Sequence, residues 1–180
     1  MRKIILGLVL CLSLCWVALA QADTLETMHI KDVNELIQKN NGKVVLLNFF
    51  ATWCPPCREE IPELVKASRT YKGKKVAIIG LSVDDSKNKA QVLSFVGKMK
   101  VPYPVYMAGK DLLLRFGIDS IPHNVFYDRT GKMVISQPGQ CDAEDIKLVI
   151  EDLLSDDWVI PRSRATRRHL NASLFCRRNS

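Results

Sequence analysis

The sequence predicts an α/β fold with a mixed central sheet and helices on both of its faces. Two continuous apolar runs, residues 43–50 and 75–83, are typical of strands that are buried on both sides. Segments with helical apolar spacing separate the strands, which implies parallel strands joined by right-handed crossovers. A hairpin around Asp128-Arg129-Thr130-Gly131 adds antiparallel strands near the C-terminus.

The N-terminal half is expected to alternate helices and strands. Residues 24–39 carry a helical pattern with Asp32 as the expected N-cap. The first buried strand leads into a helix from Pro55 to about Tyr71, and the second leads into a helix that begins at Ser86.

The C-terminal half is expected to hold a short strand, a short helix, the two hairpin strands and a last amphipathic helix. Pro102 and Pro104 separate the short strand from the preceding helix, and Gly117 ends the short helix. In order, these five elements are expected at residues 105–107, 111–116, 124–127, 132–136 and 143–154.

The 180 residues suit one domain, residues 23–157, with a distinct segment at each end. A basic start followed by the apolar run Ile4 to Ala20 is typical of a secretory signal peptide, so residues 1–22 are expected to be cleaved. The alternative is an uncleaved membrane anchor. Residues 158–180 are expected to be a disordered basic tail, with a contact to anionic lipid as the second interpretation.

The net charge of +7 comes from the two ends of the chain. Six arginines lie after Ile160 and two basic residues lie at the start, which leaves 18 basic against 19 acidic residues elsewhere. Because the body of the protein is near neutral, the basic pI gives no reason to expect nucleic-acid binding by the domain.

A pair of cysteines follows the first buried strand directly. Cys54 falls at the start of a helix, where unpaired N–H groups and the helix dipole favour a thiolate. Cys57 lies one turn later on the same helix face, close enough to form a disulfide with Cys54. Pro55 and Pro56 fix the backbone between them and limit the donors near the thiolate. The pair is predicted to be a reversible two-electron switch.

Other chemistries fit this cysteine pair less well. A zinc site needs four ligands, and no second close Cys/His pair is present, so no metal is expected. Haem attachment needs a histidine where the chain has Arg58. A peroxidase of the peroxiredoxin type needs a threonine where the chain has Ala51. An inert pair is the remaining alternative, and no cofactor is predicted.

The string W-C-P-P-C-R-E-E-I-P-E-L within Asn48 to Leu64 resembles the active-site segment of the thioredoxin superfamily. More narrowly, it is similar to the TlpA/ResA/DsbE-like branch of exported thiol–disulfide oxidoreductases. The resemblance covers about residues 25–154. It implies a thioredoxin-like fold with a TlpA-type helical insertion ahead of the hairpin.

The resemblance also implies a role for Glu60, because the matching glutamate of these relatives is buried near the cysteines and handles protons. A buried carboxyl has a raised pKa and can move protons near neutral pH. Thioredoxins carry a buried aspartate six residues before the first cysteine, where this chain has Asn48. That departure favours Glu60 as the substitute, and a solvated glutamate is the alternative.

Ile121-Pro122 matches the cis-proline loop that faces the cysteines in this superfamily. The resemblance implies that Ile121 offers backbone groups to a substrate strand, next to Trp53, Pro55 and Pro56. Phe50 either joins Trp53 in an apolar rim or packs inside. His123 either neighbours the site or is a packed, hydrogen-bonded histidine.

The predicted function is reduction of disulfides in exported proteins on the outer side of the cytoplasmic membrane. Cys54 attacks and Cys57 resolves the mixed disulfide. The resemblance implies a membrane thiol reductant of the DsbD/CcdA type as partner and apocytochrome c as a possible substrate. The alternatives are a disulfide-forming oxidase with the same residues, and a thioredoxin-fold binding or chaperone module.

Overall fold

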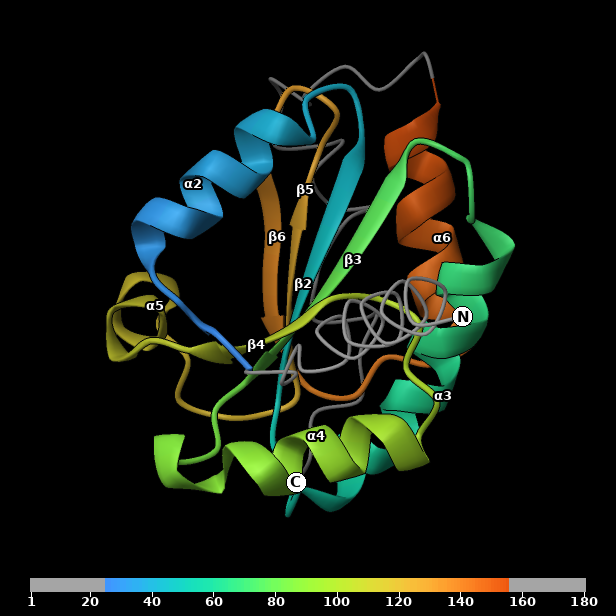
Figure 1. The fold of residues 1–180 in the computed structure, drawn as a ribbon. Helices are drawn as coiled ribbons and strands as arrows, with labels where there is room; N and C mark the ends of the chain where they lie inside the picture. The colour runs from blue at the N-terminus through green and yellow to red at the C-terminus, as the bar shows by residue number, and fades with distance from the viewer. Residues whose placement is uncertain (1–24, 156–180) are drawn as a thin grey trace, which may run out of the picture.

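Six strands form the central sheet of the computed structural model, which describes residues 25–155 (Figure 1). The strand order is β1-β4-β3-β2-β5-β6. β1, β4, β3 and β2 are parallel, whereas β5 and β6 are antiparallel to their neighbours, so the predicted mixed sheet is confirmed. The strands are Thr27–Met28 (β1), Val44–Phe50 (β2), Val76–Ser82 (β3), Val105–Ala108 (β4), His123–Tyr127 (β5) and Met133–Pro138 (β6).

Helices cover both faces of this sheet, as predicted (Figure 1). Buried residues of α3, α4 and α6 belong to the core cluster on one face, and those of α2 and α5 belong to the cluster on the other. The helices are Ile30–Lys39 (α2), Pro55–Thr70 (α3), Lys89–Lys98 (α4), Lys110–Phe116 (α5) and Ala143–Leu154 (α6).

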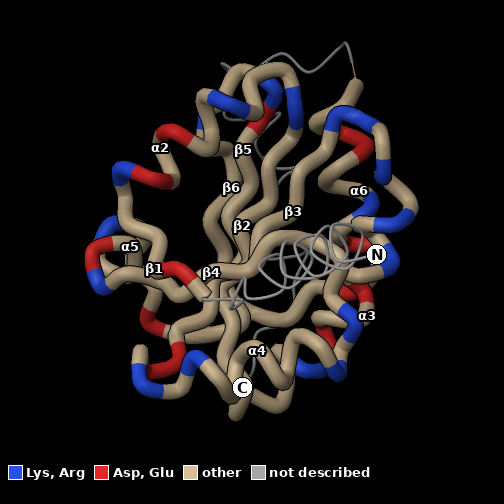
Figure 2. Tube along the Cα trace, viewed as in Figure 1, with Lys and Arg blue, Asp and Glu red and all other residues tan. Residues whose placement is uncertain are grey.

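β2 is the centre of the core, and all seven of its residues are buried. Alternate side chains enter the two layers: Leu46 packs with the α3 side and Leu47 with the α2 side. Burial of a leucine side chain contributes about 1.5–3 kcal/mol, which explains why an apolar run without alternation forms this strand. The six strands contain no Lys, Arg, Asp or Glu, which lie on the helices and connections (Figure 2).

The start of the first helix differs from the prediction. Asp32 is not the N-cap; the N-cap is His29, and Asp32 Oδ2 accepts a hydrogen bond from the His29 N–H at 2.8 Å. Asp111, far along the chain, accepts a hydrogen bond from the Ile30 N–H at 2.8 Å. A contact between distant segments therefore helps to fix where α2 begins.

Two further details were not predicted. The two-residue strand β1 precedes α2 and pairs with β4. The helix expected from Ser86 begins with a 3₁₀ turn, Ser86–Asn88, and becomes α-helical at Lys89. The short helix ahead of the hairpin is present as α5, and Gly117 ends it in the left-handed conformation at φ 62°.

The segments predicted as a signal peptide or anchor (1–22) and as a basic tail (158–180) lie outside the described residues. Within residues 25–155, none of the helices combines the length and the apolar character needed to cross a membrane.

Candidate active site

Cys54 and Cys57 form a disulfide at the start of α3, with an S–S distance of 2.03 Å. Cys54 is the N-cap of the helix, as the sequence predicted, and the Cys57 N–H donates to its Sγ at 3.2 Å. Pro55 and Pro56 have no N–H, so Cys57 supplies the first donor of the helix. The same donor can stabilise a Cys54 thiolate after reduction.

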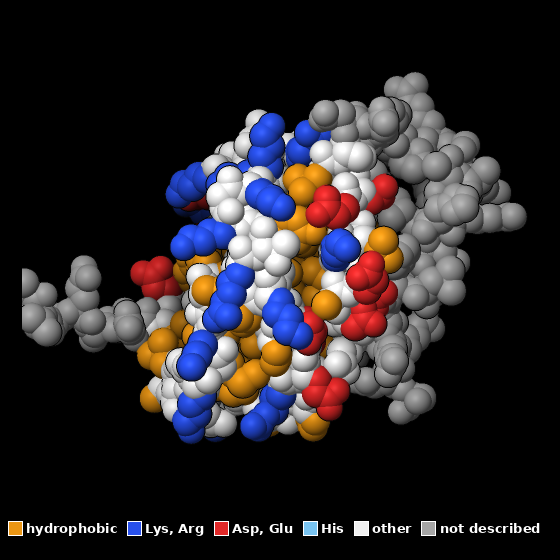
Figure 3. All heavy atoms as spheres, turned by 90° about the vertical axis from the view of Figure 1, so that its right-hand side faces the viewer, with side chains coloured by type: hydrophobic (Ala, Val, Ile, Leu, Met, Phe, Trp, Pro, Cys, Tyr) orange, Lys and Arg blue, Asp and Glu red, His pale blue; other side chains and the backbone are white. Residues whose placement is uncertain are grey.

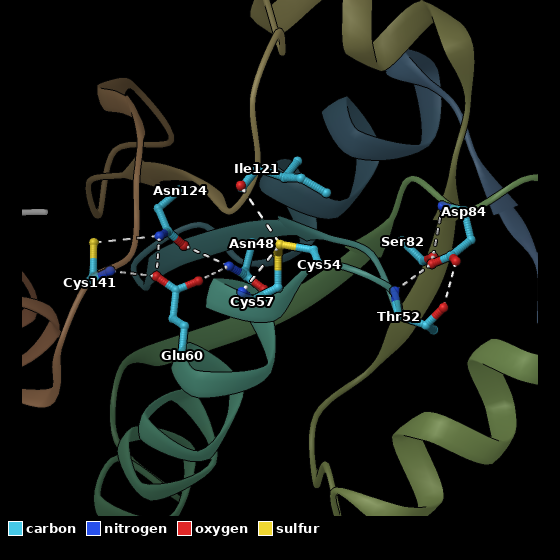
Figure 4. The surroundings of a disulfide bond; sticks show 10 residues. All are labelled: Asn48, Thr52, Cys54, Cys57, Glu60, Ser82, Asp84, Ile121, Asn124 and Cys141. Carbon is cyan, nitrogen blue, oxygen red and sulfur yellow. Dashed lines mark hydrogen bonds between the residues drawn. A yellow bond between two sulfur atoms is a disulfide. The ribbon is translucent and has the colours of Figure 1, made fainter. Parts of the chain in front are cut away.

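The Ile121–Pro122 loop lies against this disulfide (Figure 4). The peptide bond between the two residues is cis, as predicted. The Ile121 carbonyl oxygen is 3.7 Å from Cys54 Sγ. Because a disulfide sulfur carries no proton, this is a van der Waals contact in the oxidised protein; a reduced Cys54 thiol could donate to the same oxygen.

The surface beside the cysteines is partly apolar. Trp53 is 65% exposed, and Pro55 is exposed as well. Phe50 does not take part: it is buried, and its ring stacks on that of Phe95 at 6.1 Å between centroids. The rim expected around the cysteines therefore contains Trp53 but not Phe50.

Glu60 is fully buried one turn beyond Cys57, and its carboxyl accepts three hydrogen bonds of 2.8 Å (Figure 4). Asn48 Nδ2 donates to Oε2, whereas Asn124 Nδ2 and the Cys141 N–H donate to Oε1. Burial raises the pKa of the Glu60 carboxyl to about 7, against the opposing effect of the three hydrogen bonds. The side chain is therefore not the solvated glutamate of the alternative interpretation.

The two oxygens of Glu60 differ in their remaining capacity. Oε1 accepts from two N–H groups, so both of its lone pairs are used, whereas Oε2 accepts from one. A proton on the carboxyl therefore belongs on Oε2. Asn48 Oδ1, on the amide that donates to Oε2, is buried without a hydrogen-bond partner.

His123 is a packed histidine, the second of the two readings of the sequence. Its Nε2 is 2.9 Å from Ser136 Oγ, and its ring meets Phe49 edge-on. Burial lowers the pKa of His123, which favours the neutral ring. On β5, His123 and Asn124 point to opposite faces of the sheet, so Asn124 rather than His123 reaches Glu60.

Sequence reasoning assigned no role to Asn124 or to the Cys141 backbone at this site. A signal was present for Asn124, because Asn48 and Asn124 are polar residues in strands that are otherwise apolar. The antiparallel register of β2 and β5 places the two directly opposite each other. The Cys141 N–H comes from the connection ahead of α6, and no local pattern marks it.

A groove of about 880 Å³ lies between α2, the end of α3 and β3, and none of the predicted site residues lines it. Within the described part of the chain, no cluster of His, Cys, Asp and Glu side chains could hold a metal ion.

Known proteins share both the sequence and the fold. The Redoxin family matches residues 20–148. The thiol-disulfide oxidoreductase ResA of Bacillus thuringiensis (strain Al Hakam) is 33% identical over 107 residues, 59% of this chain and 61% of that protein. The sporulation thiol-disulfide oxidoreductase A of Bacillus subtilis is 26% identical over 110 residues, 60% of this chain and 67% of that protein. The chain thus spans about three fifths of the length of ResA.

Solved structures extend the comparison. A thiol:disulfide interchange protein of the thioredoxin family from Chlorobium tepidum TLS is 30% identical, with a TM-score of 0.60 over 66% of this chain and 84% of that one. StoA from Bacillus subtilis has a TM-score of 0.52 at 23% identity over 60% of this chain and 82% of that one, which shows the shared fold. These matches confirm the resemblance drawn from the cysteine segment: the chain belongs to the Redoxin family of thioredoxin-fold proteins.

Proposed function

We propose that the protein is a thiol–disulfide oxidoreductase that reduces disulfides in exported proteins. The observation that carries the proposal is the Cys54–Cys57 disulfide at the start of α3, against the Ile121–Pro122 loop. A site with two cysteines, a helix N-terminus and a buried carboxyl has the parts that thiol–disulfide exchange requires.

Exchange begins with the reduced pair. The Cys54 thiolate attacks one sulfur of the substrate disulfide, and the other substrate sulfur leaves as a thiolate. Cys57 then attacks Cys54 Sγ, which releases the second substrate sulfur and leaves the Cys54–Cys57 disulfide. Two electrons pass to the substrate, and its two thiolates take up protons.

Cys54 is the better nucleophile of the two, because the Cys57 N–H points at its sulfur. Cys57 is fully buried and must lose a proton before it can attack. Glu60 lies one turn further along α3, and burial raises the pKa of its carboxyl to about 7. Oε2 is the atom that would accept the Cys57 proton during resolution.

The surface supports a protein rather than a small molecule as substrate. Exposed Trp53 and Pro55 flank the cysteines, and neither of them lines the groove of about 880 Å³ beside α2. Figure 3, which views the side of α3 and α6, shows hydrophobic side chains exposed between Lys and Arg side chains. An extended chain could lie over Trp53 and the Ile121 backbone.

The reduction potential of the Cys54–Cys57 couple tests the direction of the reaction. Equilibration with a glutathione or dithiothreitol series, read by Trp53 fluorescence or by alkylation, gives the value. A potential near −270 mV supports a reductase, whereas one near −120 mV overturns it in favour of a disulfide-forming oxidase. An assay that mixes the reduced oxidoreductase with a disulfide-containing protein then measures turnover.

We also propose export, on the evidence of residues 1–22, with the domain on the outer side of the cytoplasmic membrane. Electrons would come from a membrane thiol reductant of the DsbD/CcdA type, and apocytochrome c is the candidate substrate. N-terminal sequencing of the full chain from expressing cells decides between a cleaved signal and an anchor. Mixed-disulfide capture in cells with and without the membrane reductant tests the partner.

A further inference from the structure

Another buried carboxylate, that of Asp84, lies beside the segment that connects β2 to α3, on the side away from Glu60 (Figure 4). Asp84 follows the end of β3 and accepts three hydrogen bonds. The Thr52 N–H donates to Oδ2 at 2.9 Å, the Thr52 hydroxyl donates to Oδ1 at 2.7 Å, and the Ser82 hydroxyl donates to Oδ2 at 2.8 Å. The family resemblance and the proposed mechanism assign no role to this cluster.

The hydrogen bonds around Asp84 have the pattern that an ionised carboxylate makes. Gln91 Nε2 donates to the Thr52 hydroxyl oxygen at 3.1 Å, and the Asp84 N–H donates to the Ser82 hydroxyl oxygen at 3.2 Å. Each hydroxyl therefore accepts one N–H and directs its own O–H to the carboxylate. With the Thr52 N–H as third donor, Asp84 acts only as an acceptor, which is what an ionised carboxylate does.

This negative charge has no cationic partner among residues 25–155. The ion pairs of the described residues lie elsewhere on the surface and do not include Asp84. Among the described residues, the groups in contact with the Asp84 carboxylate are therefore neutral hydrogen-bond donors.

Asp84 also fixes the backbone that leads to Cys54. Thr52 precedes Cys54 by two residues and is held through both its N–H and its side chain. The Val83 N–H donates to the Phe50 carbonyl at 2.8 Å, and the Cys54 N–H donates to the Ala51 carbonyl at 3.3 Å. The segment between β2 and α3 is thus attached to the end of β3.

We propose that Asp84 is a positioning residue that holds the Thr52–Cys54 segment and, as a fixed negative charge, disfavours the Cys54 thiolate and keeps the Cys54–Cys57 couple reducing. The inference rests on the proposed redox role of Cys54. Reduction places two electrons in the S–S bond, Cys57 takes up a proton, and Cys54 holds the negative charge as thiolate. A nearby anion raises the free energy of that product and so lowers the reduction potential.

The test compares Asp84→Asn with Asp85→Asn in the full chain. Both remove one negative charge, but Asp85 is exposed and its charge is screened by water. Because the variant removes a buried negative charge close to the segment that leads to Cys54, Asp84→Asn lowers the midpoint of the pH dependence of Cys54 alkylation by up to about one unit. The reduction potential rises by up to about 30 mV, the equivalent of a tenfold change in a two-electron equilibrium. Asp85→Asn leaves both unchanged.

Thr52 variants separate positioning from charge. Thr52→Val removes the hydroxyl donor and keeps the Asp84 charge, so it slows exchange without lowering the alkylation midpoint. Thr52→Ser keeps the donor and restores the exchange rate. The comparison of Thr52→Val with Thr52→Ser also tests the positioning role of Asp84 if the Asp84→Asn variant does not fold.

Two results overturn the inference. The first is that Asp84→Asn and Asp85→Asn have the same alkylation midpoint and the same reduction potential. The second is that Thr52→Val and Thr52→Ser have the same exchange rate. A wild-type potential near −120 mV would instead overturn the proposed reductase while leaving the difference between the two aspartate variants as a valid test.

Discussion

Asn48 Nδ2 donates a hydrogen bond of 2.8 Å to Glu60 Oε2, and both side chains are fully buried. The bond connects the middle of β2 to the first turns of α3, directly below the cysteine pair. An amide at position 48 gives Glu60 a neutral donor, whereas an aspartate there would place two carboxyls in one buried site. Under the proposed mechanism, the group that takes up the proton therefore lies on the helix, at Glu60, rather than on the strand, at position 48.

Glu60 is expected to make the oxidised protein less stable as the pH rises. The Glu60 pKa is about 7 in the folded protein and 4.5 in the unfolded chain. Between these values the unfolded chain has lost the proton that the folded protein keeps, so folding stability is full below pH 4.5 and falls by up to about 3 kcal/mol as the pH rises through 7.

Urea unfolding from pH 4 to 8 measures this dependence. Burial also lowers the pKa of His123, so this residue makes the protein less stable as the pH falls below 6.5. That dependence is opposite in direction to the dependence expected from Glu60. The contribution of Glu60 is therefore the difference between wild type and Glu60→Gln. Glu59→Gln, an exposed neighbour, is the control, and identical slopes for all three proteins would contradict the assignment.

Glu60→Gln should also slow resolution of the mixed disulfide, because the variant has no carboxylate to accept the Cys57 proton. General-base groups contribute about 10²–10⁴-fold, so a loss of at least about a hundredfold is expected at pH 7. Stopped-flow kinetics with a peptide disulfide measure the step, and the pH dependence of Cys54 alkylation should shift as well. An alkylation curve that matches wild type would remove Glu60 from the site.

Asn124→Leu should raise the Glu60 pKa above 7. The variant removes the hydrogen bond to Oε1 that favours the ionised form and leaves the donors from Asn48 and the Cys141 backbone in place. The pH at which stability levels off should move upward by about one to two units, since a hydrogen bond to a charged group contributes about 1.5–3 kcal/mol. The same urea series provides the measurement, and an unmoved midpoint refutes the role of Asn124.

The sequence predicted the parts of this fold that depend on local pattern. The apolar runs of β2 and β3, the prolines that open α3 and the glycine that ends α5 all act within a few residues. β1 was missed because two residues carry no period, and its existence depends on pairing with β4 across about 80 residues. The N-cap of α2 was misplaced because Asp111 contributes to it from a distance.

The active-site residues show the same difference between local pattern and distant contacts. Cys54, Cys57 and Glu60 share one helix, so spacing alone brings them together. Asn124 and the Cys141 N–H reach Glu60 only through the register of β5 and the path of the chain after β6. Asp84 reaches Thr52 because β2 and β3 are parallel neighbours that end side by side, a fact of topology that the residues around Asp84 do not encode.

Trp53→Ala should weaken the interaction with protein substrates and leave the fold intact. The side chain is 65% exposed, so the free energy of unfolding should stay within about 0.5 kcal/mol of wild type. An aromatic anchor contributes about 1–2 kcal/mol or more to binding, which predicts a five- to thirtyfold higher KM for a protein disulfide. A small disulfide should react at the wild-type rate.

Leu148→Ala is the matched control for Trp53, because Leu148 is a large hydrophobic residue that is 50% exposed on α6. The Leu148→Ala variant should keep the wild-type KM for the protein disulfide and the wild-type rate with the small disulfide. If Trp53→Ala changed the small disulfide and the protein disulfide equally, Trp53 would act on the cysteines rather than on substrate binding.

The division of roles between the two cysteines gives the last prediction. Cys54→Ala should abolish turnover, whereas Cys57→Ala should accumulate a mixed disulfide through Cys54, because no thiol remains to resolve it. An alanine at position 57 keeps the backbone N–H that donates to Cys54 Sγ at 3.2 Å, so the Cys54 thiolate stays stabilised in the trapping variant. Non-reducing gels and mass spectrometry of the digested adduct identify the linked cysteine. Cys57 is fully buried and lacks that donor, so it should react more slowly. Capture through Cys57 in the Cys54→Ala protein at a rate equal to capture through Cys54 would contradict this division of roles.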